Sequence, residues 1–151
     1  MTKKKLLAII FALVAFTSIL GCGKLEKRNN TNVEASVPMF EVIATQNVGA
    51  YRCTIVYDTD TKVEYAFFWN SSSGKTVSTM LYMPDNTPKL YSGQKTTLVF
   101  ISSEWVDSYD LSVMYDSETC VMYCCSWNSS SGDVTIQVLR SAEGTPKLFD
   151  T

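Results

Sequence analysis

The sequence contains no histidine, and the residues that stand out as candidates for a functional site are aromatic and acidic. Histidine is the usual general base and the commonest metal ligand, so its absence excludes serine–histidine and cysteine–histidine catalysis. Flat aromatic rings beside a polar loop are suited to binding sugar rings. The candidates for such a surface are Tyr57, Tyr65, Trp69, Tyr115, Tyr123 and Trp127. The alternative, which we prefer, is that these side chains supply the hydrophobic core and cross-strand pairs.

The acidic residues form two short clusters, at Asp58 and Asp60 and again at Asp116 and Glu118. A calcium loop would require a third acidic ligand and a following glycine, and both are missing. We therefore interpret the acidic residues as acceptors for the backbone of a turn, and the serine runs nearby as turn residues. We predict no metal site, no cofactor and no catalytic residue, and hence a protein that is not an enzyme.

One stretch of the chain occurs twice, because the sequence Trp-Asn-Ser-Ser-Ser-Gly at residues 69–74 returns at residues 127–132. The two segments 40–92 and 98–150 align without a gap at an offset of 58 and share 19 identical residues over 53 positions. This indicates a tandem duplication. A single unit of this size buries too little surface to be stable alone, so we expect the two units to pack together.

The alternation of residue types predicts an all-β fold of two tandem antiparallel β-meanders. Residues 51–57 and 109–115 alternate with a period of two, as half-buried strands do. Further strands are predicted around the repeated loops and at the start and end of each unit, at residues 40–45, 63–69, 76–83 and 90–91 and their equivalents in the second unit. We place the first repeat at 38–92, a linker at 93–97 and the second repeat at 98–151.

The beginning of the chain has the composition of a signal peptide. Three lysines at positions 3–5 precede an apolar run at 6–20, which is short for a membrane span. The run ends in Ile-Leu-Gly-Cys at 19–22, which resembles the signal of bacterial lipoproteins. The resemblance implies cleavage of residues 1–21, attachment of palmitate-type acyl chains to Cys22, and location on the extracytoplasmic face of the cell membrane. Two alternatives are an uncleaved N-terminal anchor and ordinary secretion.

The segment 22–37 is polar and low in aromatic residues, which is typical of a flexible tether. Removing residues 1–21 takes away three lysines and no acidic residue, so the net charge changes from −2 to −5. This charge disfavours a nucleic-acid partner. The expected partners are the membrane, through the lipid, and an unknown protein or component of the cell envelope.

The four cysteines after Cys22 are not duplicated with the repeat, which argues against a disulfide framework that arose with it. They are Cys53, Cys120, Cys124 and Cys125. Residues 120 and 124 on one strand would lie roughly 13 Å apart, too far for a disulfide. A link from Cys53 to the second repeat stays open, and we expect most of these cysteines to be small buried apolar residues.

A pattern of turn and core residues occurs in both repeats. It consists of Asp58, Thr61, Val63, Tyr65, Gly74, Leu81, Pro88 and Lys89, and again Asp116, Thr119, Val121, Tyr123, Gly132, Leu139, Pro146 and Lys147. This pattern resembles a small bacterial domain family of unknown function, found in Gram-positive bacteria and their prophages. The resemblance implies a β fold and no particular chemistry. The chain departs from the pattern where the family favours glycine, since Lys62 and Cys120 stand there.

The sequence thus favours a membrane-anchored, non-catalytic interaction or structural module. The alternative is a module that binds carbohydrate or peptidoglycan through the repeated tryptophan and tyrosine residues. The loop sequence is faintly similar to the hairpins of choline-binding cell-wall repeats, although those repeats are much shorter. Exposure of Trp69 and Trp127 discriminates between the two, because a sugar platform requires accessible rings.

Overall fold

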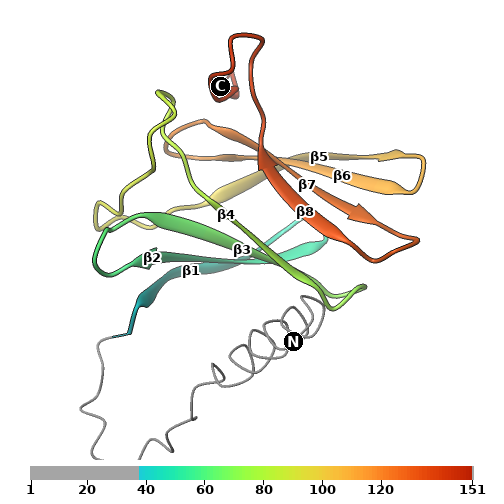
Figure 1. Cartoon of the computed structure of the whole chain (residues 1–151), viewed down its shortest axis with the longest axis horizontal. Coiled ribbons are helices and arrows are strands. Elements are labelled where there is room, and N and C mark those ends of the chain that lie inside the picture. The colour runs from blue at the N-terminus through green and yellow to red at the C-terminus, as the bar shows by residue number, and fades with distance from the viewer. Residues whose placement is uncertain (1–37, 151) are drawn as a thin grey trace, which may run out of the picture. The chain divides into compact units, whose positions relative to one another are not determined.

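The computed structural model describes residues 38–150, which form two four-stranded antiparallel sheets (Figure 1). Sheet 1 has the order β1-β2-β3-β4 and sheet 2 has the order β5-β6-β7-β8. The strands are β1 (Phe40–Val48), β2 (Tyr51–Asp58), β3 (Glu64–Asn70), β4 (Thr76–Met80), β5 (Leu98–Val106), β6 (Tyr109–Asp116), β7 (Met122–Asn128) and β8 (Val134–Val138). The predicted pair of β-meanders is confirmed. The predicted signal peptide, Cys22 and the tether lie outside the described residues.

The strand boundaries differ from the prediction at the start and end of each repeat. The opening strands continue to Val48 and Val106, and β4 ends at Met80. The predicted final strand of each repeat is reduced to isolated bridges, Val63 to Leu90 in the first and Val121 to Leu148 in the second. Proline has no N–H to donate to a ladder, and the Pro-Lys-Leu segment of each repeat begins with one.

The repeated loops are held by the same side chain in both repeats. The Oδ1 atom of Asn70 accepts hydrogen bonds from the backbone N–H groups of Ser72 and Ser73, at 2.9 and 3.0 Å. Asn128 makes the equivalent pair of bonds in the second repeat. The glycine that closes each loop has positive φ, 68° at Gly74 and 72° at Gly132. Turn formation therefore explains why the sequence of the loop is identical in the two repeats.

The backbone is also left-handed at two residues that are not glycine, Lys62 (φ 63°) and Cys120 (φ 59°). They occupy equivalent positions of the two repeats, directly after Thr61 and Thr119. A residue with a Cβ in this conformation costs roughly 1–2 kcal/mol, which glycine does not pay. Lys62 and Cys120 therefore place the same local strain in the turn of their repeat.

The variant Cys120→Gly is expected to raise the free energy of unfolding by about 0.5–1 kcal/mol, since the relief of strain exceeds the added entropy of the unfolded chain. Urea denaturation measures this change. Asp60→Gly is the control, because Asp60 lies in the equivalent turn without positive φ, and it should lower stability. Equal losses in both variants would contradict the strain.

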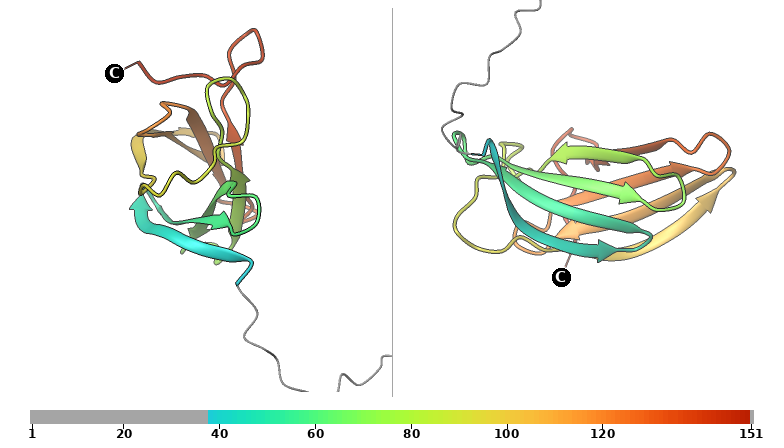
Figure 2. Two further views of the ribbon diagram at one scale, coloured as in Figure 1. Left: turned by 90° about the vertical axis from the view of Figure 1, so that its left-hand side faces the viewer. Right: turned by 90° about the horizontal axis from the view of Figure 1, so that it is seen from below.

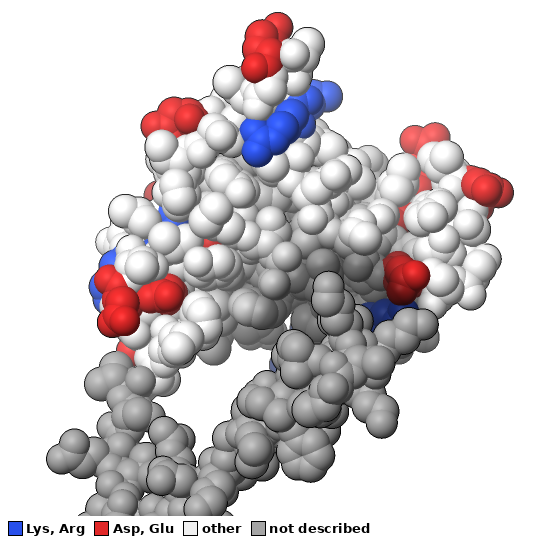
Figure 3. Space-filling model, viewed as in Figure 1, with Lys and Arg blue, Asp and Glu red and all other residues white. Residues whose placement is uncertain are grey.

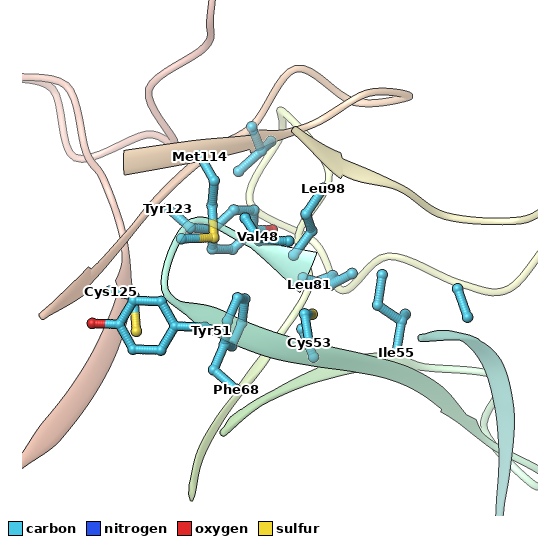
Figure 4. Packing of buried hydrophobic residues seen from close by; sticks show 13 residues of the cluster. Val48, Tyr51, Cys53, Ile55, Phe68, Leu81, Leu98, Met114, Tyr123 and Cys125 are labelled. Carbon is cyan, nitrogen blue, oxygen red and sulfur yellow. The ribbon is translucent and has the colours of Figure 1, made fainter. Parts of the chain in front are cut away.

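The two sheets pack face to face around one core (Figure 2). At one side β4 lies next to β8, and at the other β1 approaches β5. The core is drawn from both repeats (Figure 4): Ala44, Val48, Tyr51, Cys53, Ile55, Ala66, Phe68 and Leu81 from the first, and Leu98, Met114, Val121, Tyr123 and Cys125 from the second. The expectation that the two units pack as one body is confirmed, and the described residues 38–150 belong to one compact unit with this core.

The two repeats turn opposite faces toward this core. In β2 the side chains that join the core cluster are Tyr51, Cys53 and Ile55, whereas in β6 the one that joins it is Met114, with Ser112 buried on the same face. The β6 residues equivalent to the buried set of β2 are Tyr109, Leu111 and Val113, and they lie on the outside of sheet 2.

The third and fourth strands of each repeat show the same exchange. Ala66 and Phe68 are buried in β3, while Tyr123 and Cys125, the equivalents of Tyr65 and Phe67, are buried in β7. In β8 the core-facing side chains are Val134, Ile136 and Val138, which are equivalent to the outward residues of β4. Equivalent strands keep the same order, so the repeats are related like successive layers of a stack and not like the halves of a symmetric pair.

Candidate functional site

The outer face of sheet 1 carries a row of aromatic side chains. Successive residues of a strand point to opposite faces, so burial of Ala66 and Phe68 places Tyr65, Phe67 and Trp69 outside. Trp69 is 42% exposed. On the neighbouring strand β2, Arg52 pairs in register with Trp69. The result is an accessible indole next to a guanidinium group.

Two open hollows meet at this place, and both are lined by Arg52 and Trp69. The first has a volume of about 240 Å³ and lies at the end of the sheet; it is lined by Asn47, Gly49, Ala50, Tyr51, Arg52, Trp69 and Ser71. The second, of about 340 Å³, lies on the outer face and is lined by Arg52, Thr54, Phe67, Trp69 and Thr76. We call these five residues the Trp69 hollow. Its lining offers an aromatic face, hydroxyl groups and one positive charge, which suits a ring that carries hydroxyl groups.

Of the six aromatic residues that the sequence singled out, only Tyr65 and Trp69 lie on this face. Tyr57 is buried against Tyr91, with ring centroids 4.3 Å apart, and its hydroxyl donates a hydrogen bond to Glu41. This bond, with burial, raises the pKa of Tyr57 to about 12. Tyr115 is stacked on Phe149 at 4.4 Å in the same way. Both tyrosines close the final turn of their repeat.

The remaining two, Tyr123 and Trp127, point into the core. Tyr123 is fully buried, its hydroxyl accepts a hydrogen bond from the backbone N–H of Tyr82 at 2.9 Å, and burial raises its pKa. Trp127 packs on the core and on Trp105, with centroids 5.9 Å apart. The two copies of the tryptophan are therefore not equivalent, because Trp69 is exposed on the outer face and Trp127 is half-buried and packs against the core.

The outer face of sheet 2 is a second surface with apolar side chains, interspersed with Ser102, Glu104, Ser126 and Thr135, and the sequence did not reveal it. It is formed by the outward residues of β5, β6 and β7, which include Val106, Tyr109, Leu111, Val113, Met122 and Cys124. Val106 and Tyr109 are 49% and 45% exposed. These residues were predicted to alternate, and that is correct, but a period of two does not show which of the two faces is buried.

A cluster of charged side chains lies buried where the two repeats meet. Lys89 is 2% exposed, and its Nζ lies 2.8 Å from Oδ2 of Asp116, which is wholly buried, and 2.8 Å from Oε2 of Glu118 at the surface. Thr96, in the linker, accepts a hydrogen bond from the lysine and donates one to Glu64 at 2.6 Å. The second oxygen of Asp116 accepts backbone N–H groups of its own turn.

The cluster is the main electrostatic contact between the repeats. Burial by itself would lower the pKa of Lys89, but its bonds to Asp116 and Glu118 raise the pKa above its usual value. The lysine is therefore charged at neutral pH, and it neutralises Asp116. Burial raises the pKa of Glu64, which outweighs the hydrogen bond from Thr96. The sequence offered Lys89 and Asp116 only as positions of a pattern, because the pairing crosses the two repeats.

The turn of the first repeat confirms the interpretation of Asp58, whose Oδ1 accepts the N–H groups of Asp60 and Thr61 at 2.8 and 3.0 Å. Within residues 38–150, no three histidine, cysteine, aspartate or glutamate side chains are grouped so as to hold a metal ion. The cysteines of this part of the chain are free; Cys53 and Cys125 are buried, whereas Cys120 and Cys124 are half-buried.

No family model, no curated protein sequence and no solved structure matches this chain. The part of the chain that the structure describes holds no helix with the length and hydrophobicity of a membrane span. The fold and the side chains of the two outer faces are accordingly the basis for the function proposed below.

Proposed function

We propose that this chain is a lipid-anchored, extracytoplasmic and non-catalytic interaction module, which binds a protein or envelope component through the outer faces of its two sheets. The observation that carries the proposal is that large apolar side chains are exposed on both faces. The largest exposed apolar side chains there include Val42 at 66%, Trp69 at 42%, Val106 at 49% and Tyr109 at 45%. Contiguous exposed apolar surface on a folded domain marks interaction sites.

The side of the molecule formed by β4 and β8 also carries few charged residues. On the side where β4 and β8 lie, lysine, arginine, aspartate and glutamate gather at the margins and the middle of the view is free of charge (Figure 3). Neither β4 nor β8 contains a charged residue.

Anchoring through Cys22 rests on the resemblance to lipoprotein signals. Labelling with palmitate, and its loss in Cys22→Ser, tests the anchor.

The interaction surfaces can be tested by site-specific photo-crosslinking of the full chain on intact cells. A benzophenone amino acid at Phe67 or Tyr109 is expected to give covalent adducts, because both positions lie on the proposed surfaces. The same residue at Gln94, an exposed linker position, is the control and should give none. Absence of adducts at both faces, with the chain present in the membrane fraction, would refute the proposal.

A carbohydrate-binding function is the second candidate, and the Trp69 hollow favours it. The exposed indole of Trp69 supplies a flat face, and Arg52 and Thr54 supply polar groups beside it. Within the described residues only the first repeat offers this site, since Trp127 is half-buried and packs against the core.

Co-sedimentation of the 38–151 unit with purified cell-wall sacculi distinguishes the two candidates. If the wall is the ligand, the parent is retained and Trp69→Ala is lost to the supernatant, because stacking on the indole is removed. Tyr109→Ala, on the opposite outer face, is the matched control and should be retained like the parent. Failure of the parent to sediment would exclude the wall and leave a protein partner.

A further inference from the structure

The two repeats pack on each other through two different faces, and the equivalent of each buried face is exposed on the other repeat. The contact inside the molecule joins the inner face of sheet 1 to the inner face of sheet 2, and these are different faces of the repeat. The outer face of sheet 2 is equivalent to the inner face of sheet 1. The outer face of sheet 1 is equivalent to the inner face of sheet 2. An interface between unlike faces does not close on itself, so further copies can add at either end.

The Trp69 hollow is the equivalent of a surface that is already occupied inside the molecule. Its five lining residues correspond to Asp110, Ser112, Cys125, Trp127 and Val134 of the second repeat. Tyr51 of sheet 1 lies against this inner surface, beside Cys125 (Figure 4), and burial together with Cys125 and Asp110 raises its pKa. The residue equivalent to Tyr51 is Tyr109, which is 45% exposed on the outer face of sheet 2.

The hollow and the exposed tyrosine are therefore complementary by descent and by chemistry. Inside the molecule the hydroxyl of Tyr51 and Oδ1 of Asp110 are both buried without a hydrogen-bond partner among the described residues. At the outer face, Tyr109 of another copy would instead meet the guanidinium of Arg52, a hydrogen-bond donor for its hydroxyl. Phe67 and Trp69 would contact its ring, in the places that Cys125 and Trp127 take inside the molecule.

The charged residues fit the same arrangement. Inside the molecule, Lys89 of the first repeat pairs with Asp116 and Glu118 of the second. The equivalent lysine of the second repeat is Lys147, which is exposed. The equivalent acids of the first repeat are Asp58 and Asp60, and none of the ion pairs within residues 38–150 uses them. A copy stacked on sheet 2 would bring its own Asp58 and Asp60 to Lys147.

We infer that the partner of the two outer faces is a second copy of this chain, stacked head to tail so that Tyr109 of one molecule enters the Trp69 hollow of the next. The inference rests on the proposed function, because it names the partner of the interaction module. Since each stacked copy again exposes one free face of each kind, the product is an open row of molecules and not a closed dimer. On a membrane, a lipid anchor would restrict the copies to one plane and favour their meeting.

Sedimentation velocity of the 38–151 unit over a wide range of concentration tests the stacking. The parent is expected to form species that grow beyond dimers as the concentration rises. Phe67→Glu removes one face and Tyr109→Glu the other, so each variant alone should be monomeric. An equimolar mixture of the two should form a dimer and nothing larger, because only one intact pair of faces remains. Gln94→Glu adds the same charge in the linker and should behave as the parent does.

A parent that stays monomeric at all concentrations would overturn the inference, and so would single variants that still associate or a mixture that does not. Circular dichroism and thermal melting establish that each variant is folded. If either is unfolded, Thr54→Glu and Leu111→Glu place the same charge on the same two faces. Photo-crosslinked adducts to other proteins, together with a monomeric parent, would leave the interaction module standing and remove only the second copy as its partner.

Discussion

The variant Lys89→Met is expected to lower the free energy of unfolding by about 3–5 kcal/mol. The substitution keeps most of the volume of the side chain but leaves the carboxylate of Asp116 buried without its cation, and removing one member of a buried ion pair costs about this much. Chemical denaturation at neutral pH measures the loss. Lys147→Met is the matched control, because Lys147 is the same residue of the second repeat and is exposed, so its change should stay within about 0.5 kcal/mol.

The pH dependence of stability gives an independent check on the same lysine. The pKa of Lys89 is raised in the folded protein, so its contribution is fully present below its unfolded pKa of about 10.5 and is lost as the pH rises through the higher folded value. The difference between the parent and Lys89→Met should therefore shrink in strong alkali. A constant difference, or equal losses in the Lys89 and Lys147 variants, would show that the charge of Lys89 does not hold the repeats together.

Two pairs of tyrosines occupy equivalent positions in the repeats, Tyr51 with Tyr109 and Tyr65 with Tyr123. In the first pair we expect the tyrosine of the first repeat to matter more for stability, and in the second pair the tyrosine of the second repeat. Tyr51 is buried while its equivalent Tyr109 is exposed, and Tyr123 is buried while its equivalent Tyr65 lies on the outer face. Truncating a large buried aromatic side chain costs about 3–5 kcal/mol. Tyr51→Ala and Tyr123→Ala should each lose this amount, and Tyr109→Ala and Tyr65→Ala about 1 kcal/mol or less.

The opposite order in the two pairs is what makes this set of variants informative. If the two sheets packed with equivalent faces, as the halves of a symmetric sandwich would, both members of each pair would lose similar amounts. A large loss at Tyr51 and Tyr109 with small losses at the other two would place the same face of both repeats in the core. Denaturation of the four variants at low concentration, where no stacking contributes, separates these results.

The sequence by itself determined the architecture of the described part of this chain. The offset of 58 residues, the alternation at 51–57 and the repeated loop led to two antiparallel meanders, because each of these is a local property of the chain. A period of two, an asparagine that bonds the next turn, and a glycine with positive φ act within a few residues. The need of a small unit to bury its surface then required the two repeats to pack together.

Which face of each meander is buried was decided only by the tertiary structure. Both faces of the repeat carry enough apolar side chains to form a core, as the buried Tyr51, Cys53 and Ile55 of one repeat and the buried Met114, Tyr123 and Cys125 of the other show. A period of two in the sequence separates the two faces of a strand but does not show which of them is buried. That Trp69 lies on the outer face and Trp127 packs against the core therefore could not be read from two identical segments.

The buried charges were likewise beyond the sequence. Lys89 and Lys147 stand in the same Pro-Lys-Leu segment, and Asp58 and Asp116 in the same turn, yet only Lys89 and Asp116 meet inside the protein. Local patterns are the same in both repeats, but the first repeat is covered on one face and the second repeat on the other. The physical reason is that the environment of a side chain depends on what packs against its sheet, and two copies cannot both occupy the same layer of a stack.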